Sequence, residues 1–132
     1  MTIGKTIRNA LLVGYSAIAF ASIVQAEKVH YPFPAAAQEI AQLIWLAETA
    51  NVCGWATRTE SEQFELFAVR FLSAHLEGVN KIAFVGMVGN ENYLEKVRTV
   101  AIHNANETCK MARWQSGWVA YKAAADENNG RY

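Results

Sequence analysis

Apolar residues recur at helical spacing along much of the chain. In residues 35–52 they lie on one face of a helix, and this pattern predicts a first helix that ends near Gly54. The positions on that face are Ile40, Leu43, Ile44 and Ala47. The two prolines before them, Pro32 and Pro34, disfavour helix, so we expect residues 27–34 to form an extended lead-in.

A second helix is expected to begin in the segment Thr57–Glu62. It holds two overlapping Thr-x-x-Glu patterns, either of which can form a capping box. A stripe of apolar residues follows, formed by Phe64, Phe67, Phe71 and Leu72. If the helix passes Gly78, the same stripe continues with His75, Val79 and Ile82. Glycines at 78, 86 and 89 each disfavour helix, so residues 79–90 form either a kinked continuation or a separate short helix.

The most regular pattern lies in residues 92–126, where a stripe resembling a heptad seam predicts a third helix. Its members are Tyr93, Val97, Val100, Asn104, Glu107, Met111, Trp114, Trp118 and Tyr121. The helix is either continuous or broken near residues 103–106, and the polar residues 127–132 are expected to fray. Together these segments predict an all-α bundle of three to four helices.

The first 26 residues have the layout of a secretory signal peptide. A head with Lys5 and Arg8 precedes an uncharged, mostly apolar run, and Ala26 ends a segment typical of a cleavage site. The apolar run is shorter than a membrane-spanning helix requires, so cleavage after Ala26 is favoured over retention as an anchor. We therefore expect a single domain over residues 27–132, periplasmic or secreted, with no stable membrane anchor.

Charge narrows the classes of partner. The chain has 12 Lys and Arg against 12 Asp and Glu, and removal of residues 1–26 takes two basic residues and no acid. The remaining domain has a net charge of minus two and no basic run. Such a surface argues against nucleic acid or an anionic membrane as the partner.

The only two cysteines are Cys53 and Cys109. An even number of cysteines in an exported domain favours a disulfide. A zinc or thioredoxin-type site needs a CxxC motif or a cluster of cysteines and histidines, which this chain lacks. A structural Cys53–Cys109 disulfide is therefore predicted, with a free or catalytic thiol as the alternative.

Residues that could carry chemistry are few. His103 and Glu107 are four positions apart on the expected third helix and are weak candidates for a metal site, because a zinc site needs at least three ligands. His75 lies on the phenylalanine stripe and is a second candidate for an enzyme, although a semi-buried structural histidine is the simpler interpretation. No nucleophile or phosphate-loop motif is present, and we expect no cofactor.

The candidate interaction surface is the aromatic end of the third helix, formed by Met111, Trp114, Trp118 and Tyr121. In the simpler interpretation the second helix covers it with its phenylalanines; in the other it stays open and docks a partner. We expect a non-enzymatic protein that binds another extracytoplasmic protein, or itself as a homo-oligomer, in an accessory, chaperone-like or immunity/inhibitor-type role. The alternative is a small periplasmic enzyme or metal-binding protein that uses His103 and Glu107 or His75.

Overall fold

Five helices build residues 33–132, the part of the chain that the computed structural model describes. They are α3 (Phe33–Val52), α4 (Arg58–Ala74), α5 (Gly78–Val88), α6 (Glu91–Thr108) and α7 (Ala112–Asn128). No strand occurs in this part, so the all-α prediction is confirmed, but the expected number of three to four helices was too low. The expected signal peptide and most of the lead-in lie outside the described residues.

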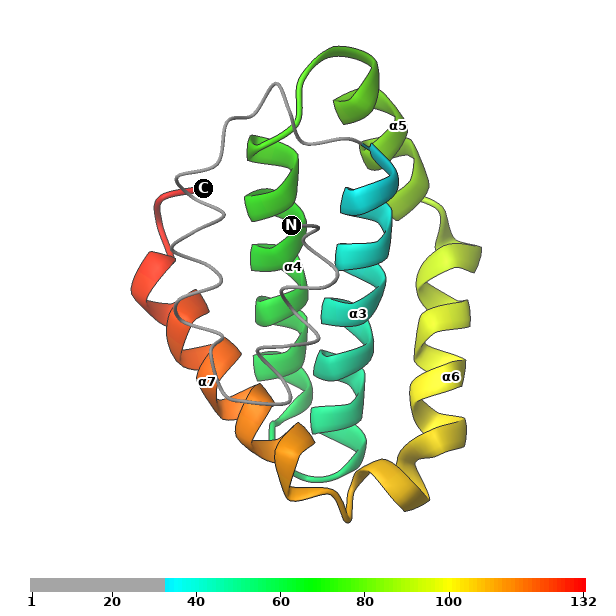
Figure 1. Cartoon of the computed structure of the whole chain (residues 1–132), viewed down its shortest axis with the longest axis vertical. Coiled ribbons are helices and arrows are strands. Elements are labelled where there is room, and N and C mark those ends of the chain that lie inside the picture. The colour runs from blue at the N-terminus through cyan, green and yellow to red at the C-terminus, as the bar shows by residue number, and fades with distance from the viewer. Residues whose placement is uncertain (1–32) are drawn as a thin grey trace.

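Helix α3 is the centre of the bundle. It packs against each of the other four helices, and Figure 1 shows it between α4 and α6. Its buried apolar residues form one broad face of the helix: Ala36, Ile40, Leu43, Ile44, Leu46, Ala47 and Ala50. The opposite side of α3 carries Gln38, which is exposed, and Ala41 and Trp45, which are half-buried. The central position of α3 therefore follows from its contacts with four helices, which the spacing of its apolar residues alone does not indicate.

The beginning of α4 follows the predicted capping box. Thr57 Oγ1 accepts a hydrogen bond from the Glu60 amide at 3.1 Å, and Glu60 Oε1 accepts one from the Thr57 amide at 2.9 Å. The helix ends at Ala74 with His75 as its C-cap, and Gly78 has a φ of +58°, a conformation that glycine adopts without strain. Residues after Gly78 form the separate short helix α5, one of the two alternatives that the glycines left open.

The long third helix is instead two helices, and they break at residues 109–111 rather than near 103–106. Helix α6 buries Ala101, Ala105 and Thr108 against the core, whereas α7 buries Trp118 and Tyr121. At 100° per residue these two buried faces would lie roughly half a turn apart on one straight helix. A break is therefore required for both faces to reach the core.

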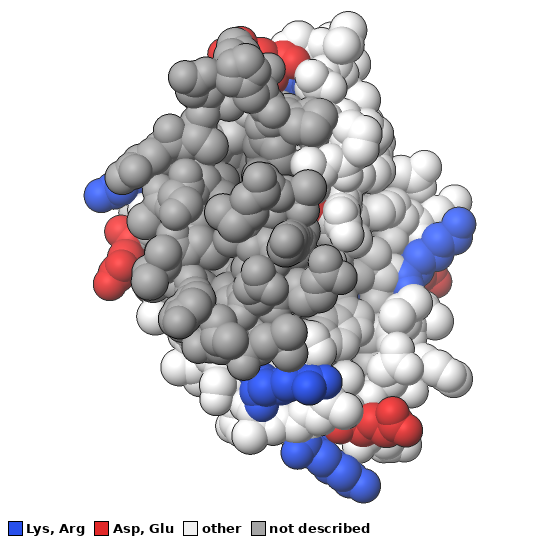
Figure 2. Space-filling view, in the orientation of Figure 1, with Lys and Arg blue, Asp and Glu red and all other residues white. Residues whose placement is uncertain are grey.

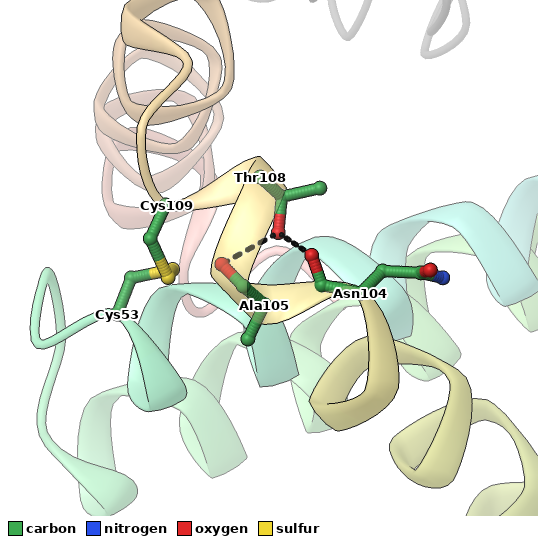
Figure 3. Close-up of a disulfide and its surroundings, with 5 residues drawn as sticks. All are labelled: Cys53, Asn104, Ala105, Thr108 and Cys109. Atoms are coloured by element: carbon green, nitrogen blue, oxygen red, sulfur yellow. Dashed lines mark hydrogen bonds between the residues drawn. A yellow bond between two sulfur atoms is a disulfide. The ribbon is translucent and has the colours of Figure 1, made fainter.

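The Cys53–Cys109 disulfide closes the same end of the bundle, and its prediction is confirmed. It joins the segment after α3 to the C-terminal end of α6, with Cα atoms 5.3 Å apart (Figure 3). Beside it the Thr108 hydroxyl donates to the Asn104 carbonyl at 3.0 Å. The disulfide and this last helical turn fix the point from which α7 turns back along the bundle.

The C-terminal end of the chain packs on α4 instead of fraying. Tyr132 lies 5.1 Å from the ring of Phe71 and 5.7 Å from that of His75, measured between ring centroids.

Of the helices in residues 33–132, none combines the length and the apolar character that crossing a bilayer would require.

Candidate functional site

Helices α4, α5 and α6 enclose a groove with a cavity volume of about 360 Å³, within the range typical of ligand sites. Its apolar lining comes from three helices and from the centre of α3: Ile44, Leu66, Val69, Val85, Val88 and Leu94. Glu62, Glu65 and Arg98 supply its only charged groups. We call it the α4–α5–α6 groove.

Two other depressions fit a binding role less well. One, of about 310 Å³, lies between α4 and α7 and is bordered by charged side chains that include Lys122, Glu60 and Asp126. Lys122 pairs with both carboxylates, at 3.9 and 2.9 Å, so this border is a set of exposed ion pairs. The other is lined by five residues of α6 alone, from Asn92 to Val100, and no second helix walls it.

A buried ion cluster forms the polar part of the groove region. Glu48 of α3 has no exposed side-chain surface, and its carboxylate accepts two hydrogen bonds from Arg58, at 2.9 and 3.0 Å. Arg98 of α6 donates a third from Nε at 2.9 Å. Arg58 also donates to Asn51 Oδ1 at 2.8 Å, which fixes its orientation. One carboxylate thus joins α3, α4 and α6, with bidentate geometry that offsets its desolvation.

Glu65 shares the cluster and lines the groove. The pKa of Glu65 is raised to about 8. The largest cause is burial of the side chain, followed by its hydrogen bond with Glu48 and by the charge of Glu48. Burial alone would also raise the pKa of Glu48, but hydrogen bonds from Arg58 and Glu65 and the charges of both arginines outweigh it and hold that pKa below its ordinary value. At neutral pH the cluster therefore holds one carboxylate, one protonated carboxyl and two guanidinium groups.

The outer face of α5 extends the apolar surface beyond the groove. Val79 is 79% exposed and Ile82 is 74% exposed, and Ala83 and Gly86 lie on the same stripe, also exposed. Ile82 lies one turn before Val85, so this outer face runs into the groove. The part of α5 that faces the viewer in Figure 2 is uncharged. A contiguous exposed aliphatic face of this kind often marks an interaction surface, whereas single exposed apolar residues are common on any protein.

The aromatic surface that the sequence pattern suggested is largely core. Trp118 is 3% exposed and lies edge-on to Phe64 of α4 with centroids 5.1 Å apart, and Tyr121 is 1% exposed. Both residues are thus corrected from candidate surface to core. Met111 and half-buried Trp114 stay at the surface, where Trp114 Nε1 lies 3.2 Å from Met111 Sδ and the Trp114 ring packs edge-on against Trp45.

The histidine candidates do not gather into a site. His75 is buried, its Nδ1 donates to the Phe71 carbonyl at 2.7 Å, and its ring lies against Phe71 and Tyr132, so it serves the packing of α4. His103 and Glu107 are both exposed on α6. Within residues 33–132 no group of three or more His, Cys, Asp or Glu side chains could hold a metal ion.

A second buried carboxyl lies away from the groove. Glu39 is 1% exposed, its Oε2 has no hydrogen-bond partner, and burial raises its pKa to about 9. Burial, and then the neighbouring Glu39, also raise the pKa of Tyr121. Glu39 and Glu48 lie nine positions apart, which places them on opposite sides of α3, and both are buried.

Sequence reasoning missed the groove and its charged residues. Nothing in the sequence distinguishes Glu65 from an ordinary solvent-facing charge near the start of a helix, and Arg98 and Val85 have no distinctive spacing. Helices distant in sequence bring them together, so no local motif could have indicated the site. The one available signal was the uninterrupted apolar character of residues 82–88 in a segment too short for a core helix of its own.

Comparison with known proteins gives no relative from which a role could be transferred. No family model matches the chain, and no curated protein or solved structure is significantly similar to it.

Proposed function

We propose that this protein is an exported, disulfide-linked helical binding protein that takes an apolar segment of another extracytoplasmic protein into the α4–α5–α6 groove. The observation that carries the proposal is the continuity of the apolar groove with the exposed outer face of α5. A groove walled by helices and bordered by aliphatic side chains is suited to an amphipathic helix or an extended apolar segment.

The size of this surface favours a macromolecule over a small ligand. The groove alone holds only a few aliphatic side chains, whereas Val79 and Ile82 lie outside it and are about three-quarters exposed. A small molecule in the groove would leave that face in water, and a protein segment would cover both. The disulfide supports an extracytoplasmic location, because such bonds persist mainly in oxidising compartments.

The enzyme alternative has less support. Catalysis at a histidine needs a second titratable group within hydrogen-bond reach and a concave site around both. His75 is engaged in packing, and His103 and Glu107 lie on the solvent side of α6 outside the three depressions described above. The remaining surface candidates, Met111 and Trp114, form a smaller patch at the disulfide end.

The test is affinity capture from the extracytoplasmic fraction with matched baits. Val85→Asp places a charge in the groove, and Val119→Asp places one at another exposed aliphatic position, on α7. We expect one partner to be retained by the wild-type and Val119→Asp proteins and lost by Val85→Asp, with the fold of each bait checked by circular dichroism. Equal loss or equal retention with both variants would exclude the groove as the binding surface.

Self-association is the competing occupant of the same surface. Sedimentation of the purified protein separates the two cases. A monomer at micromolar concentration leaves the groove for a different protein, whereas a dimer that Val85→Asp converts to a monomer would identify a second copy as the occupant.

A further inference from the structure

The buried ion cluster of Glu48, Arg58, Glu65 and Arg98 has more positive than negative charge. Arg58 and Arg98 contribute two positive charges and Glu48 one negative charge, while the Glu65 carboxyl hydrogen-bonds to Glu48 in its neutral form. Glu62 also lines the groove and is exposed like Arg98, so its negative charge offsets this surplus over the groove as a whole. The surplus of one positive charge is therefore confined to the cluster of Glu48, Arg58, Glu65 and Arg98, beside the apolar surface.

Arg98 is the group that presents this charge to the groove. Only its Nε is engaged with Glu48, its side chain is 47% exposed, and it lines the groove together with Glu65. Arg58, in contrast, uses both terminal nitrogens on Glu48 and Asn51. The terminal nitrogens of Arg98 form a planar pair of donors, the arrangement that suits a carboxylate.

We propose that the α4–α5–α6 groove recognises an apolar protein segment that carries a carboxylate, which binds the Arg98 guanidinium beside the Glu65 side chain. This inference rests on the function proposed above and names the chemistry of the partner. A carboxylate at this position neutralises the surplus charge, while the apolar residues next to it cover Val85, Leu94 and the outer face of α5. The carboxylate is either an acidic side chain or a chain terminus.

The protonation of Glu65 gives the recognition a pH signature. Glu65 faces Glu48 from α3, Arg58 and Glu62 on its own helix and Arg98 from α6, and the groove residues of α5 (Val85, Val88 and Gly89) are uncharged. Below pH 8 Glu65 is neutral and the surplus positive charge is present. As the pH rises through about 8, Glu65 ionises, the surplus disappears and the bound carboxylate is repelled. Recognition of the carboxylate is thus strongest at neutral or mildly acidic pH.

The experiment compares three peptide libraries of the same composition, with five positions drawn from Ala, Val, Leu, Ile and Phe behind a Gly-Ser-Gly-Ser leader. One library ends in a free carboxylate, one in a carboxamide, and one in a carboxamide with a single Glu among the apolar positions. Retention on the immobilised protein is quantified by mass spectrometry at pH 6.5 and pH 9. The proteins are the wild type, Arg98→Gln, Glu65→Gln and, as the matched control, Arg113→Gln on α7.

We expect at least one carboxylate library to be retained about tenfold more than the carboxamide at pH 6.5 by the wild type and by Arg113→Gln. The preference should fall below about twofold at pH 9 in the wild type, persist at pH 9 in Glu65→Gln, and be absent from Arg98→Gln. Because Glu65→Gln keeps the neutral hydrogen-bonding partner of Glu48, it tests the inference even if Arg98→Gln folds poorly. Which carboxylate library is preferred distinguishes a side chain from a chain terminus.

Equal retention of all three libraries would overturn the carboxylate inference and leave the apolar groove as a binding surface. A preference that Arg98→Gln leaves intact in a folded protein, or that is as strong at pH 9 as at pH 6.5 in the wild type, would also overturn it. Retention of no library by any of the proteins would contradict both this inference and the function proposed above.

Discussion

Two carboxyl groups on α3 show how differently burial acts on one residue type. Glu48 has three hydrogen bonds from two arginines and stays ionised, whereas the Oε2 atom of Glu39 has no partner and the burial of that side chain is uncompensated. A charge in such a position is costly unless the group is protonated, so the pKa of Glu39 rises to about 9. Glu48 therefore supports the fold as an anion, and Glu39 supports it only as a neutral acid.

Glu39→Gln is predicted to stabilise the protein above neutral pH. In the unfolded chain Glu39 has an ordinary pKa near 4.5, so the unfolded state binds fewer protons at this position and stability falls as the pH rises from about 4.5 to about 9. At pH 7 the corresponding cost is about 3 kcal/mol, and the glutamine variant avoids it. Urea unfolding at pH 4.5 and pH 8.5 measures the effect. If the free energies of unfolding of the variant and the wild type differ by the same amount at both pH values, the raised pKa of Glu39 is contradicted.

The two tryptophans of the α7 region are predicted to differ strongly. Trp118→Ala removes a buried ring from the contact with Phe64 and should cost roughly 3 to 5 kcal/mol of unfolding free energy, whereas half-buried Trp114 should cost clearly less. Thermal or chemical denaturation of both variants makes the comparison. Equal losses would mean that Trp118 is not in the core.

Residue-level features with a local cause could be predicted from the sequence. The capping box at Thr57 and Glu60 depends on four consecutive residues, and the disulfide prediction depends on there being two cysteines in a chain that is expected to be exported. The proximity of Glu48, Glu65 and Arg98 depends on how three helices pack, for which the sequence holds no local signal. The candidate groove was missed for this reason.

At the scale of the elements, a regular stripe in the sequence concealed a break. The stripe from Tyr93 to Tyr121 fits one helix, yet its middle members Val100, Asn104 and Glu107 are exposed and the buried face of α6 is displaced by one residue, to Ala101, Ala105 and Thr108. Small residues on that face allow α6 to approach α3 closely. Periodicity identifies a helix reliably, but it does not decide which face is buried when small residues compete with larger ones.

The glycines of α5 give a pair of opposite predictions. Gly86 lies inside the helix and an added Cβ would meet nothing within 4 Å, so Gly86→Ala should stabilise the fold by roughly 0.5 to 1 kcal/mol. Gly78 has a φ of +58°, and Gly78→Ala should destabilise the fold by roughly 1 kcal/mol. Thermal denaturation of the two variants is the measurement. A loss of stability with Gly86→Ala would contradict the open space that the structure shows around Gly86.

At the scale of the whole molecule, the disulfide and the central helix α3 hold the bundle together. The bond spans a sequence separation of 56 residues and ties α3 to α6, the pair of helices with the most extensive contact. The fold class and this bond could be predicted from helical spacing and cysteine chemistry. The central position of α3 could not, because it depends on contacts among segments far apart in sequence.

Replacement of both cysteines by serine is predicted to lower the melting temperature by more than about 15 °C. A closed loop of this length contributes on the order of 4 kcal/mol in the loop-entropy model, and each kcal/mol shifts the melting temperature of a domain of this size by about 4 to 8 °C. Scanning calorimetry of the double variant and of the reduced wild type should give the same lowered value. Melting unchanged by reduction would remove the disulfide from the account of stability.

The most direct test of the central claim, that the α4–α5–α6 groove binds a partner protein, is site-specific photocrosslinking in the native compartment. A benzophenone side chain is placed at Leu66 or Ile82 beside the groove, at Trp114 in the aromatic patch, or at Val119 on α7, and each protein is irradiated in intact cells. The account predicts that positions 66 and 82 give the same crosslinked partner and that position 119 gives none. A partner that crosslinks from position 114 or 119 and not from positions 66 and 82 would contradict it.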